Sequence, residues 1–105
     1  MNDADSGEAA GRITLELRFF ATFRAAVGQK VLSREFDAGA TVGDVLAAIE
    51  SEFPDLAGDI LDEEGAIKPQ LSVLKNGREV IHIEGTETPT ADGDTLSVFP
   101  PVAGG

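Results

Sequence analysis

The last seven residues, Phe99-Pro100-Pro101-Val102-Ala103-Gly104-Gly105, offer the clearest chemistry in this sequence. The prolines lack amide donors and favour a stiff extended segment, and glycine has no side chain. Residues 101–105 can therefore project roughly 17 Å, at about 3.4 Å per residue. Such a tail can thread through a narrow channel and present its carboxylate to a nucleotide in another protein. Attack of the Gly105 carboxylate on an α-phosphate would give an acyl-adenylate, which sulfur or amine nucleophiles can then attack.

The other residues offer little chemistry. The chain has no cysteine, which excludes disulfides, thiolate zinc sites, iron–sulfur clusters and cysteine nucleophiles. Its one histidine, His82, lies between two isoleucines in an expected strand, so we assign it a structural role. Asp62-Glu63-Glu64 lacks the glycine spacing of a calcium loop and is expected to be a solvated turn. We therefore predict no metal site and no catalytic residue.

Composition narrows the class of protein. A chain of 105 residues, 42% of them hydrophobic, is expected to form one domain. A net charge of −11 disfavours nucleic acid and membrane surfaces as partners. The acidic, lysine-poor composition favours a halophilic source, with an acidic mesophilic protein as the alternative. The sequence has no apolar run long enough to span a membrane and an acidic N-terminus, so we expect a cytoplasmic protein. Nothing in the sequence indicates self-association, and we expect a free monomer.

Hydrophobic periodicity predicts the elements that position the tail. Residues 1–11 are expected to be a disordered acidic tail, residues 12–100 the folded domain and residues 101–105 a flexible tail. Thr41 opens the clearest helix, which Pro54 ends. The expected strands are residues 13–20, 30–37, 71–75, 79–83 and 95–99, with a helical turn at 21–27 and an Asn76-Gly77 hairpin.

The resulting order is β-β-α-β-β-β, in which one long helix follows a hairpin and further strands return around it. This order predicts an α+β fold, a β-grasp roll with a mixed sheet of about five strands wrapped round one main helix. The alternative is a ferredoxin-like split βαβ fold, which needs a second full helix after residue 61. No segment of that kind is present in the sequence.

Several short motifs together resemble one family. They are Phe19-Phe20-Ala21 with Arg24 and Gly28, Thr41-Val42, Asn76-Gly77, Asp92-Gly93-Asp94 and the terminal FPPVAGG. On these residues the chain resembles the MoaD/ThiS-type ubiquitin-like sulfur carriers, which include the small archaeal ubiquitin-like modifier proteins (SAMP). The resemblance covers about residues 12–105. The family commonly has serine or threonine where this chain has Ala103, and the extension 1–11 is a second departure.

The resemblance implies that an E1-like ATPase, using ATP and magnesium, adenylates Gly105. The adenylate would become a thiocarboxylate that donates sulfur to molybdopterin, tRNA or thiazole, or would form an isopeptide bond with a target lysine. Pro101, Val102, Ala103 and Gly104 would thread into the partner, in one case the large subunit of molybdopterin synthase. The carrier itself would have no catalytic activity and no permanently bound cofactor.

Two phenylalanines predict where such a partner docks. Phe20 and Phe99 lie in the outward register of the first and last strands, which are adjacent in a β-grasp sheet. We expect an exposed aromatic pair beside the tail, with Arg24 at its rim, and the family docks its activating enzyme on this surface. The alternative is that Phe20 folds under the following turn and Phe99 covers a strand edge.

Three functions remain open: a sulfur carrier, a protein modifier, and a β-grasp interaction module whose Gly-Gly is incidental. The first two share the acyl-adenylate, so the sequence does not separate them. Lys30, Lys68 and Lys75 are candidate acceptors for another copy of the chain, and the sequence does not rank them.

Overall fold

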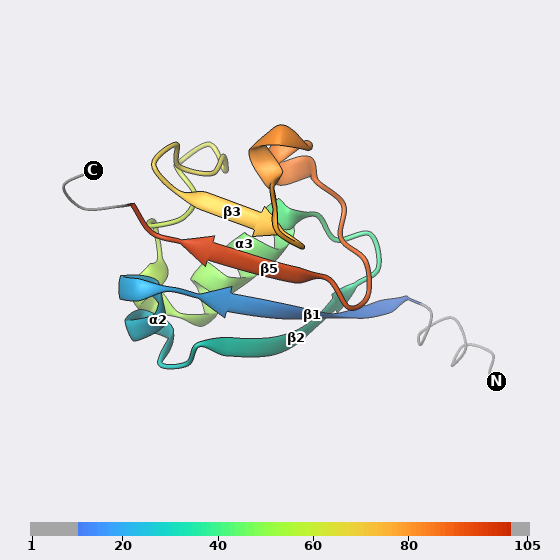
Figure 1. The fold of residues 1–105 in the computed structure, drawn as a ribbon, viewed down its shortest axis with the longest axis horizontal. Helices are drawn as coiled ribbons and strands as arrows, with labels where there is room; N and C mark the ends of the chain where they lie inside the picture. The colour runs from blue at the N-terminus through green and yellow to red at the C-terminus, as the bar shows by residue number, and fades with distance from the viewer. Residues whose placement is uncertain (1–10, 102–105) are drawn as a thin grey trace.

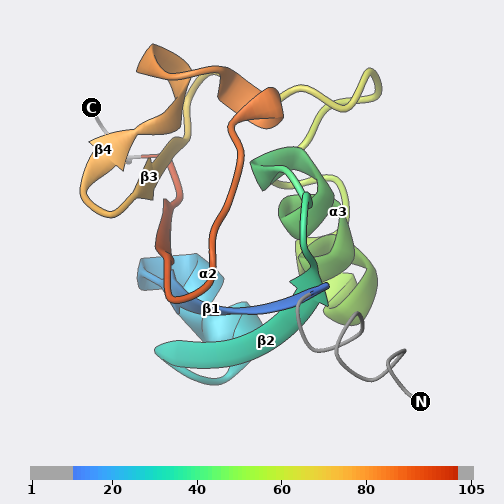
Figure 2. The same ribbon diagram turned by 90° about the vertical axis from the view of Figure 1, so that its right-hand side faces the viewer.

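A five-stranded mixed sheet curls around one helix in the computed structural model, which describes residues 11–101 (Figures 1 and 2). The strands follow the order β2-β1-β5-β3-β4 across the sheet. The elements are β1 (Arg12–Phe19), α2 (Ala21–Val27), β2 (Val31–Asp37), α3 (Val42–Glu52), β3 (Ser72–Lys75), β4 (Arg78–Glu79) and β5 (Thr95–Phe99), with 3-10 turns η1 (Pro54–Leu56), η2 (Val80–His82) and η3 (Gly85–Glu87).

The first and last strands are neighbours at the centre of the sheet. β1 and β5 run parallel, with Phe19 opposite Val98, whereas the β1–β2, β3–β5 and β3–β4 pairs are antiparallel. Both central strands end at the side of the sheet where α2 lies (Figure 1). The predicted β-grasp roll is therefore confirmed, and the ferredoxin-like alternative is wrong.

Alternation along the central strands separates a buried face from an exposed one. In β1, Leu15, Leu17 and Phe19 are almost completely buried, whereas the residues between them are exposed or half-buried. In β5, Leu96 and Val98 are buried in the same way. These side chains pack against the apolar face of α3, formed by Val42, Val45, Leu46 and Ile49. We call the opposite side of the sheet its outer face.

Local hydrogen bonds fix the main helix, as its sequence predicts. The Thr41 hydroxyl accepts from Asp44 N at 3.2 Å, and Thr41 N donates to the Asp44 carboxylate at 3.0 Å, which completes a reciprocal capping box. The shorter helix α2 ends at Gly28, whose φ of 86° is the left-handed conformation expected of a glycine cap. No helix within residues 11–101 has the length and apolarity needed to cross a membrane.

The Asp92-Gly93-Asp94 turn clamps the start of β5 onto its neighbours. Asp92 accepts from Thr14 N at 2.7 Å, and the Asp94 carbonyl accepts from Glu16 N at 2.9 Å. The Asp94 carboxylate also accepts from the Asn76 amide at 2.9 Å. This motif, which carries part of the family resemblance, therefore has a structural role, because it holds β1, β5 and the β3–β4 turn together.

Two expectations near β4 are wrong. The strand expected at residues 79–83 is only two residues long, and the chain continues as the 3-10 turn η2. His82 is exposed in that turn and does not lie in a strand. Val80 is buried and Ile83 half-buried, a spacing of three that matches the three-residue period of a 3-10 helix.

The residue before β1 is also paired with β2. Gly11, the last residue of the predicted N-terminal tail, has a carbonyl that accepts from Ala38 N at 2.6 Å, which extends the β1–β2 pairing by one residue. The rest of the predicted N-terminal tail, residues 1–10, lies outside the described residues, as do residues 102–105 of the C-terminal tail.

Candidate docking face and root of the C-terminal tail

Phe20 and Phe99 form a stacked pair on the outer face of the sheet. Their ring centroids are 4.1 Å apart and the ring planes differ by 10°. Both residues are half-buried. The parallel register of β1 and β5 explains the contact, because Phe19 is opposite Val98 and the next residue of each strand points outward. The predicted proximity of the two rings is confirmed.

A strained residue turns the chain directly after Phe20. Ala21 has φ of 53°, a left-handed conformation that costs a residue with a Cβ about 1–2 kcal/mol. The turn ends β1 and begins α2, with the Phe20 carbonyl accepting from Phe23 N at 3.0 Å and Arg24 N at 3.3 Å. Phe23 is buried in the core, whereas Phe20 stacks on Phe99, which lies on the outer face of the sheet. The alternative in which Phe20 folds under the helical turn is therefore wrong.

Other side chains extend this face. Arg24 is exposed on α2, one helical turn beyond Phe20, and its position at the rim stays a prediction. One row across the sheet contains Val31, Arg18, Ser97 and Leu74 on four neighbouring strands. Val31 is 38% exposed and Leu74 half-buried, so apolar side chains continue on either side of the phenylalanine pair. Sequence reasoning missed these two, although strand alternation marks both as outward.

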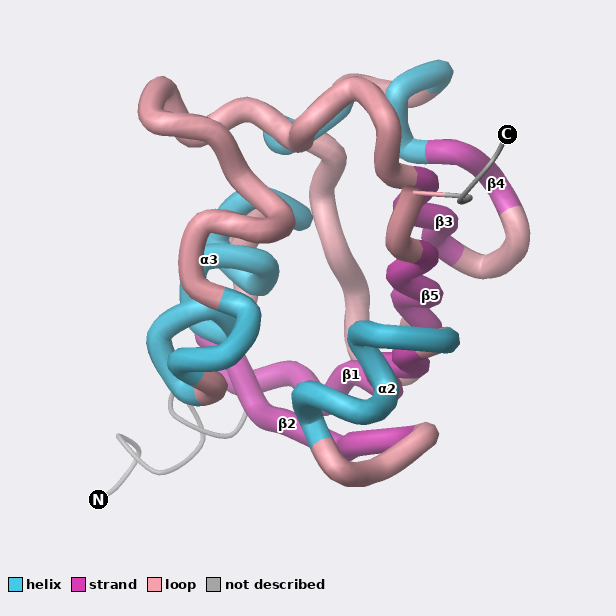
Figure 3. The backbone as a smooth tube through the Cα atoms, turned by 90° about the vertical axis from the view of Figure 1, so that its left-hand side faces the viewer, coloured by secondary structure: helices cyan, strands magenta, loops and turns pink. Residues whose placement is uncertain are grey.

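Pro101 lies at the root of the tail, two residues beyond β5. It lines a hollow of about 260 Å³ together with Thr22, Phe23, Asp59, Lys68, Gln70 and Leu71. These residues come from α2, from the long loop between η1 and β3, and from the chain after β5. Figure 3 shows α2 and the sheet from the side at which β5 ends. No sequence motif joins these segments, so sequence reasoning did not find the hollow. The threading residues Val102, Ala103 and Gly104 and the reactive Gly105 lie outside the described residues.

The candidate acceptor lysines differ in accessibility. Lys30 is exposed in the turn before β2, where its backbone carbonyl accepts from Phe19 N at 3.0 Å. Lys68 is half-buried at the tail-root hollow. Lys75 is held by the Pro89 carbonyl at 3.0 Å, and its side chain is only 21% exposed. The structure therefore ranks Lys30 as the most accessible of the three.

The acidic residues do not gather into a metal site in the described part of the chain. Within residues 11–101, no cluster of three or more histidine, cysteine or carboxylate side chains could hold an ion. Asp62, Glu63 and Glu64 are exposed, and the Asp62 carboxylate accepts from Glu64 N and Ala66 N within its own turn. The predicted solvated turn is confirmed.

Comparison with known proteins supports the same interpretation. The ThiS family profile matches residues 17–105. Small archaeal modifier protein 3 of Haloferax volcanii is 59% identical over 91 residues, which cover 87% of this chain and 98% of that protein. The sulfur carrier protein CysO of Mycobacterium tuberculosis is 30% identical over 80 residues, covering 74% of this chain and 83% of CysO.

The fold is also shared with a solved structure. The crystal structure of SAMP1 from Haloferax volcanii superposes with a TM-score of 0.76 at 33% identity, covering 88% of this chain and 99% of that one. Relatives in this genus fit the halophilic source that the acidic composition predicts. The chain therefore belongs to the ThiS family, and its relatives include archaeal modifier proteins and sulfur carriers.

Proposed function

We propose that this protein is a ubiquitin-like sulfur carrier and protein modifier that an E1-like enzyme activates at the Gly105 carboxylate. The observation that carries the proposal is the position of β5. This strand is paired with β1 on one side and β3 on the other, and it leads into the tail beside the Phe20–Phe99 pair. A partner bound to the outer face would receive the tail from a fixed point.

The proposed chemistry begins with the terminal carboxylate. An oxygen of Gly105 attacks the α-phosphorus of ATP, the bond to the β-phosphate breaks, and pyrophosphate leaves. The activating enzyme supplies ATP and magnesium, and the carrier needs no cofactor of its own. Hydrosulfide then attacks the acyl carbon, the C–O bond to AMP breaks, and AMP leaves with the electron pair. The tail now ends in a thiocarboxylate, and the need for ATP places this step in the cytoplasm.

The modifier branch uses the same activated carbonyl. A lysine Nζ attacks the acyl carbon, AMP leaves, the nitrogen loses a proton to solvent, and an isopeptide bond joins Gly105 to the target. When the target is a second copy of this chain, we expect Lys30 to be the acceptor because it is the most exposed lysine. In the carrier branch, the sulfur acceptor would be presented by a partner such as the large subunit of molybdopterin synthase.

Deletion of Gly104-Gly105 separates these functions from the interaction module. The chain and its deletion variant are incubated with the host's activating enzyme, ATP, magnesium and labelled pyrophosphate for the exchange assay, and with hydrosulfide in place of pyrophosphate for the mass measurement. ATP–pyrophosphate exchange and intact mass are then measured. The matched control deletes two residues, Asn2-Asp3, at the other end. We expect exchange and a mass gain of one sulfur for one oxygen in the chain and the control, and neither in the Gly-Gly deletion. Exchange that survives the Gly-Gly deletion would refute the proposal.

A further inference from the structure

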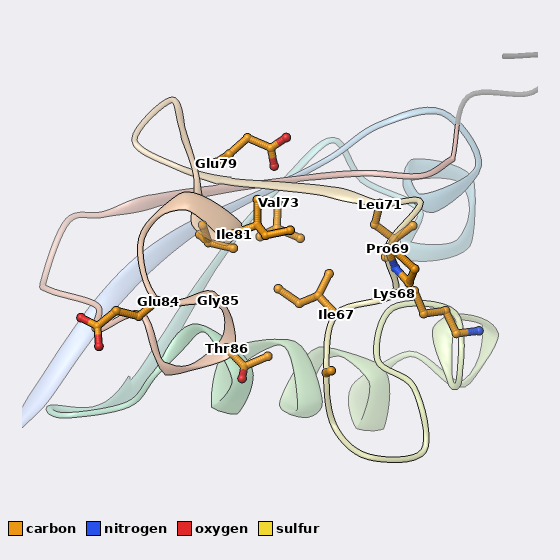
Figure 4. Close-up of a pocket in the computed structure, with 12 residues that line it drawn as sticks. Ile67, Lys68, Pro69, Leu71, Val73, Glu79, Ile81, Glu84, Gly85 and Thr86 are labelled. Carbon is orange, nitrogen blue, oxygen red and sulfur yellow. The ribbon is translucent and has the colours of Figure 1, made fainter.

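An apolar hollow lies between β3, the loop at residues 66–69 and the turns η2 and η3 (Figure 4). Its volume is about 320 Å³. Leu71, Val73 and Val80 are buried at its base, and Ile67 and Ile81 stand around it on different loops. Ile81 is 69% exposed, although it is a large aliphatic side chain. We call this hollow the Ile67–Ile81 pocket.

The sheet separates the apolar floor of this pocket from the docking face, whereas Glu79 at its rim lies on the outer side, where its carboxylate accepts from Ser72 Oγ at 3.4 Å. Val73 is opposite Val98 on the buried face of the sheet, whereas the neighbouring Ser72 is opposite Phe99 on the outer face. The pocket therefore opens below β3, between the loop after α3 and the turns η2 and η3 (Figure 4). A side chain bound on this floor would leave the Phe20–Phe99 pair free, and the pocket shares Lys68 and Leu71 with the hollow at the root of the tail.

Carboxylates surround the pocket. Glu79 and Glu84 line it directly, and Lys68 is the basic residue in its lining. The acidic turn Asp62-Glu63-Glu64 lies beside it, because Asp62 N donates to the carbonyl of the lining residue Ala66 at 2.8 Å. The apolar floor is therefore bordered by two carboxylates and one lysine, with the acidic turn beside them.

The charge around the pocket favours some binding partners over others. A second copy of this chain carries a net charge of −11 and would be repelled, and the acidic N-terminal segment would be repelled in the same way. The C-terminal tail also brings a negative carboxylate. A positively charged segment with an aliphatic side chain would pack that side chain on the apolar floor and pair its charges with the carboxylates at the rim.

We propose that the Ile67–Ile81 pocket binds one aliphatic side chain of a protein partner whose neighbouring residues are lysine or arginine. The aliphatic side chain packs between Ile67 and Ile81, and the basic residues pair with Glu84 and the acidic turn. This site gives the protein a second binding surface, distinct from the Phe20–Phe99 pair. The proposal does not depend on the chemistry of Gly105.

The test uses the full chain and a short labelled peptide with one isoleucine flanked by lysines. Binding is measured by fluorescence anisotropy in 1 M KCl, where the Debye length is about 3 Å and long-range attraction is screened. Amide chemical shifts then locate the peptide. We expect shifts at Ile67, Val80, Ile81 and Thr86, and few at Phe20 and Phe99. A peptide with serine in place of isoleucine controls for binding by charge alone.

Two variants and a control decide the outcome. Ile81→Ser is expected to weaken binding by about tenfold, the loss expected for one aliphatic contact, and Glu84→Gln by roughly threefold. Both residues are exposed, so we expect both variants to fold, which their amide spectra will confirm. Glu35→Gln, on the opposite edge strand β2, should bind as the unchanged chain does. Equal binding of the serine peptide, unchanged affinity in Ile81→Ser, or shifts centred on the phenylalanine pair would overturn the proposal.

Discussion

Replacing Phe20 or Phe99 by alanine should separate docking from folding. Complete removal of a buried phenylalanine costs about 3–5 kcal/mol of stability. Because both rings are half-buried, we expect about half of that loss, roughly 1.5–2.5 kcal/mol for each variant. The two losses should not add, since the stacked contact is worth about 0.5–1.5 kcal/mol and disappears with either ring.

The effect on docking should be larger than the effect on the fold. An aromatic anchor at the centre of an interface costs 2 kcal/mol or more when truncated, which is about 30-fold in affinity. We therefore expect each single variant to bind the activating enzyme about 30-fold more weakly. Affinity is measured by calorimetry and stability by urea unfolding, with both single variants and the double variant forming a cycle.

Phe36→Ala is the matched control. Phe36 is also half-buried, but it lies in β2 and packs against the core on the opposite face from the pair. The Phe36→Ala variant should lose folding stability as the other two variants do, but keep its affinity for the activating enzyme. If all three variants lose affinity only in proportion to their unfolded fraction, the pair is part of the core and the docking argument fails.

Three further changes test how the scaffold is held. Gly43→Ala should destabilise the fold by about 1–3 kcal/mol in urea unfolding, because its Cβ would lie 2.8 Å from Thr86 Cβ; unchanged stability would show that η3 yields easily. Glu50→Gln should cost about 1–2 kcal/mol, because that carboxylate accepts from two loop N–H groups at 2.9 Å each; unchanged stability in thermal unfolding would contradict this. The hydrogen bond from Arg34 lowers the pKa of Glu52 from its ordinary value of 4.5. The Arg34–Glu52 pair therefore adds less than about 1 kcal/mol to the free energy of unfolding. This stabilisation is complete above pH 4.5 and is lost as the pH falls through the lowered pKa. Glu52→Gln should therefore reduce the loss of folding stability at acidic pH. A pH profile of stability that is the same in this variant would show that the Arg34–Glu52 pair makes no contribution.

Local signals predicted the fold well. The capping box at Thr41 and Asp44 depends only on residues three apart in the sequence. The Asn76-Gly77 turn has φ of 53° and 87° at its two residues, as a tight hairpin requires. The Phe20–Phe99 contact is long-range in sequence but was predictable, because the β-grasp order fixes which strands are neighbours and alternation fixes which face each ring takes.

The errors arose where a short apolar run fits two structures. Val80-Ile81-His82-Ile83 satisfies the composition of a strand, and only its burial at every third residue distinguishes a 3-10 turn. The contact of Glu50 with the loop at residues 60 and 61 and the two hollows depend on how separate loops pack. Residue spacing in the sequence does not indicate how separate loops pack, so these features could not be predicted.

The structure assigns separate tasks to the domain and the tail. β5 cannot shift without breaking its hydrogen bonds to β1 and β3, so the root of the tail is fixed within the sheet. The reach of the Gly105 carboxylate is then set by the four residues after Pro101, roughly 14 Å at about 3.4 Å per residue. If the proposed function is correct, the activating enzyme has to place its nucleotide within about 14 Å of Pro101. Phe99 is the last residue of β5, so its stacked pair with Phe20 is the surface best placed to set this distance in the proposed complex.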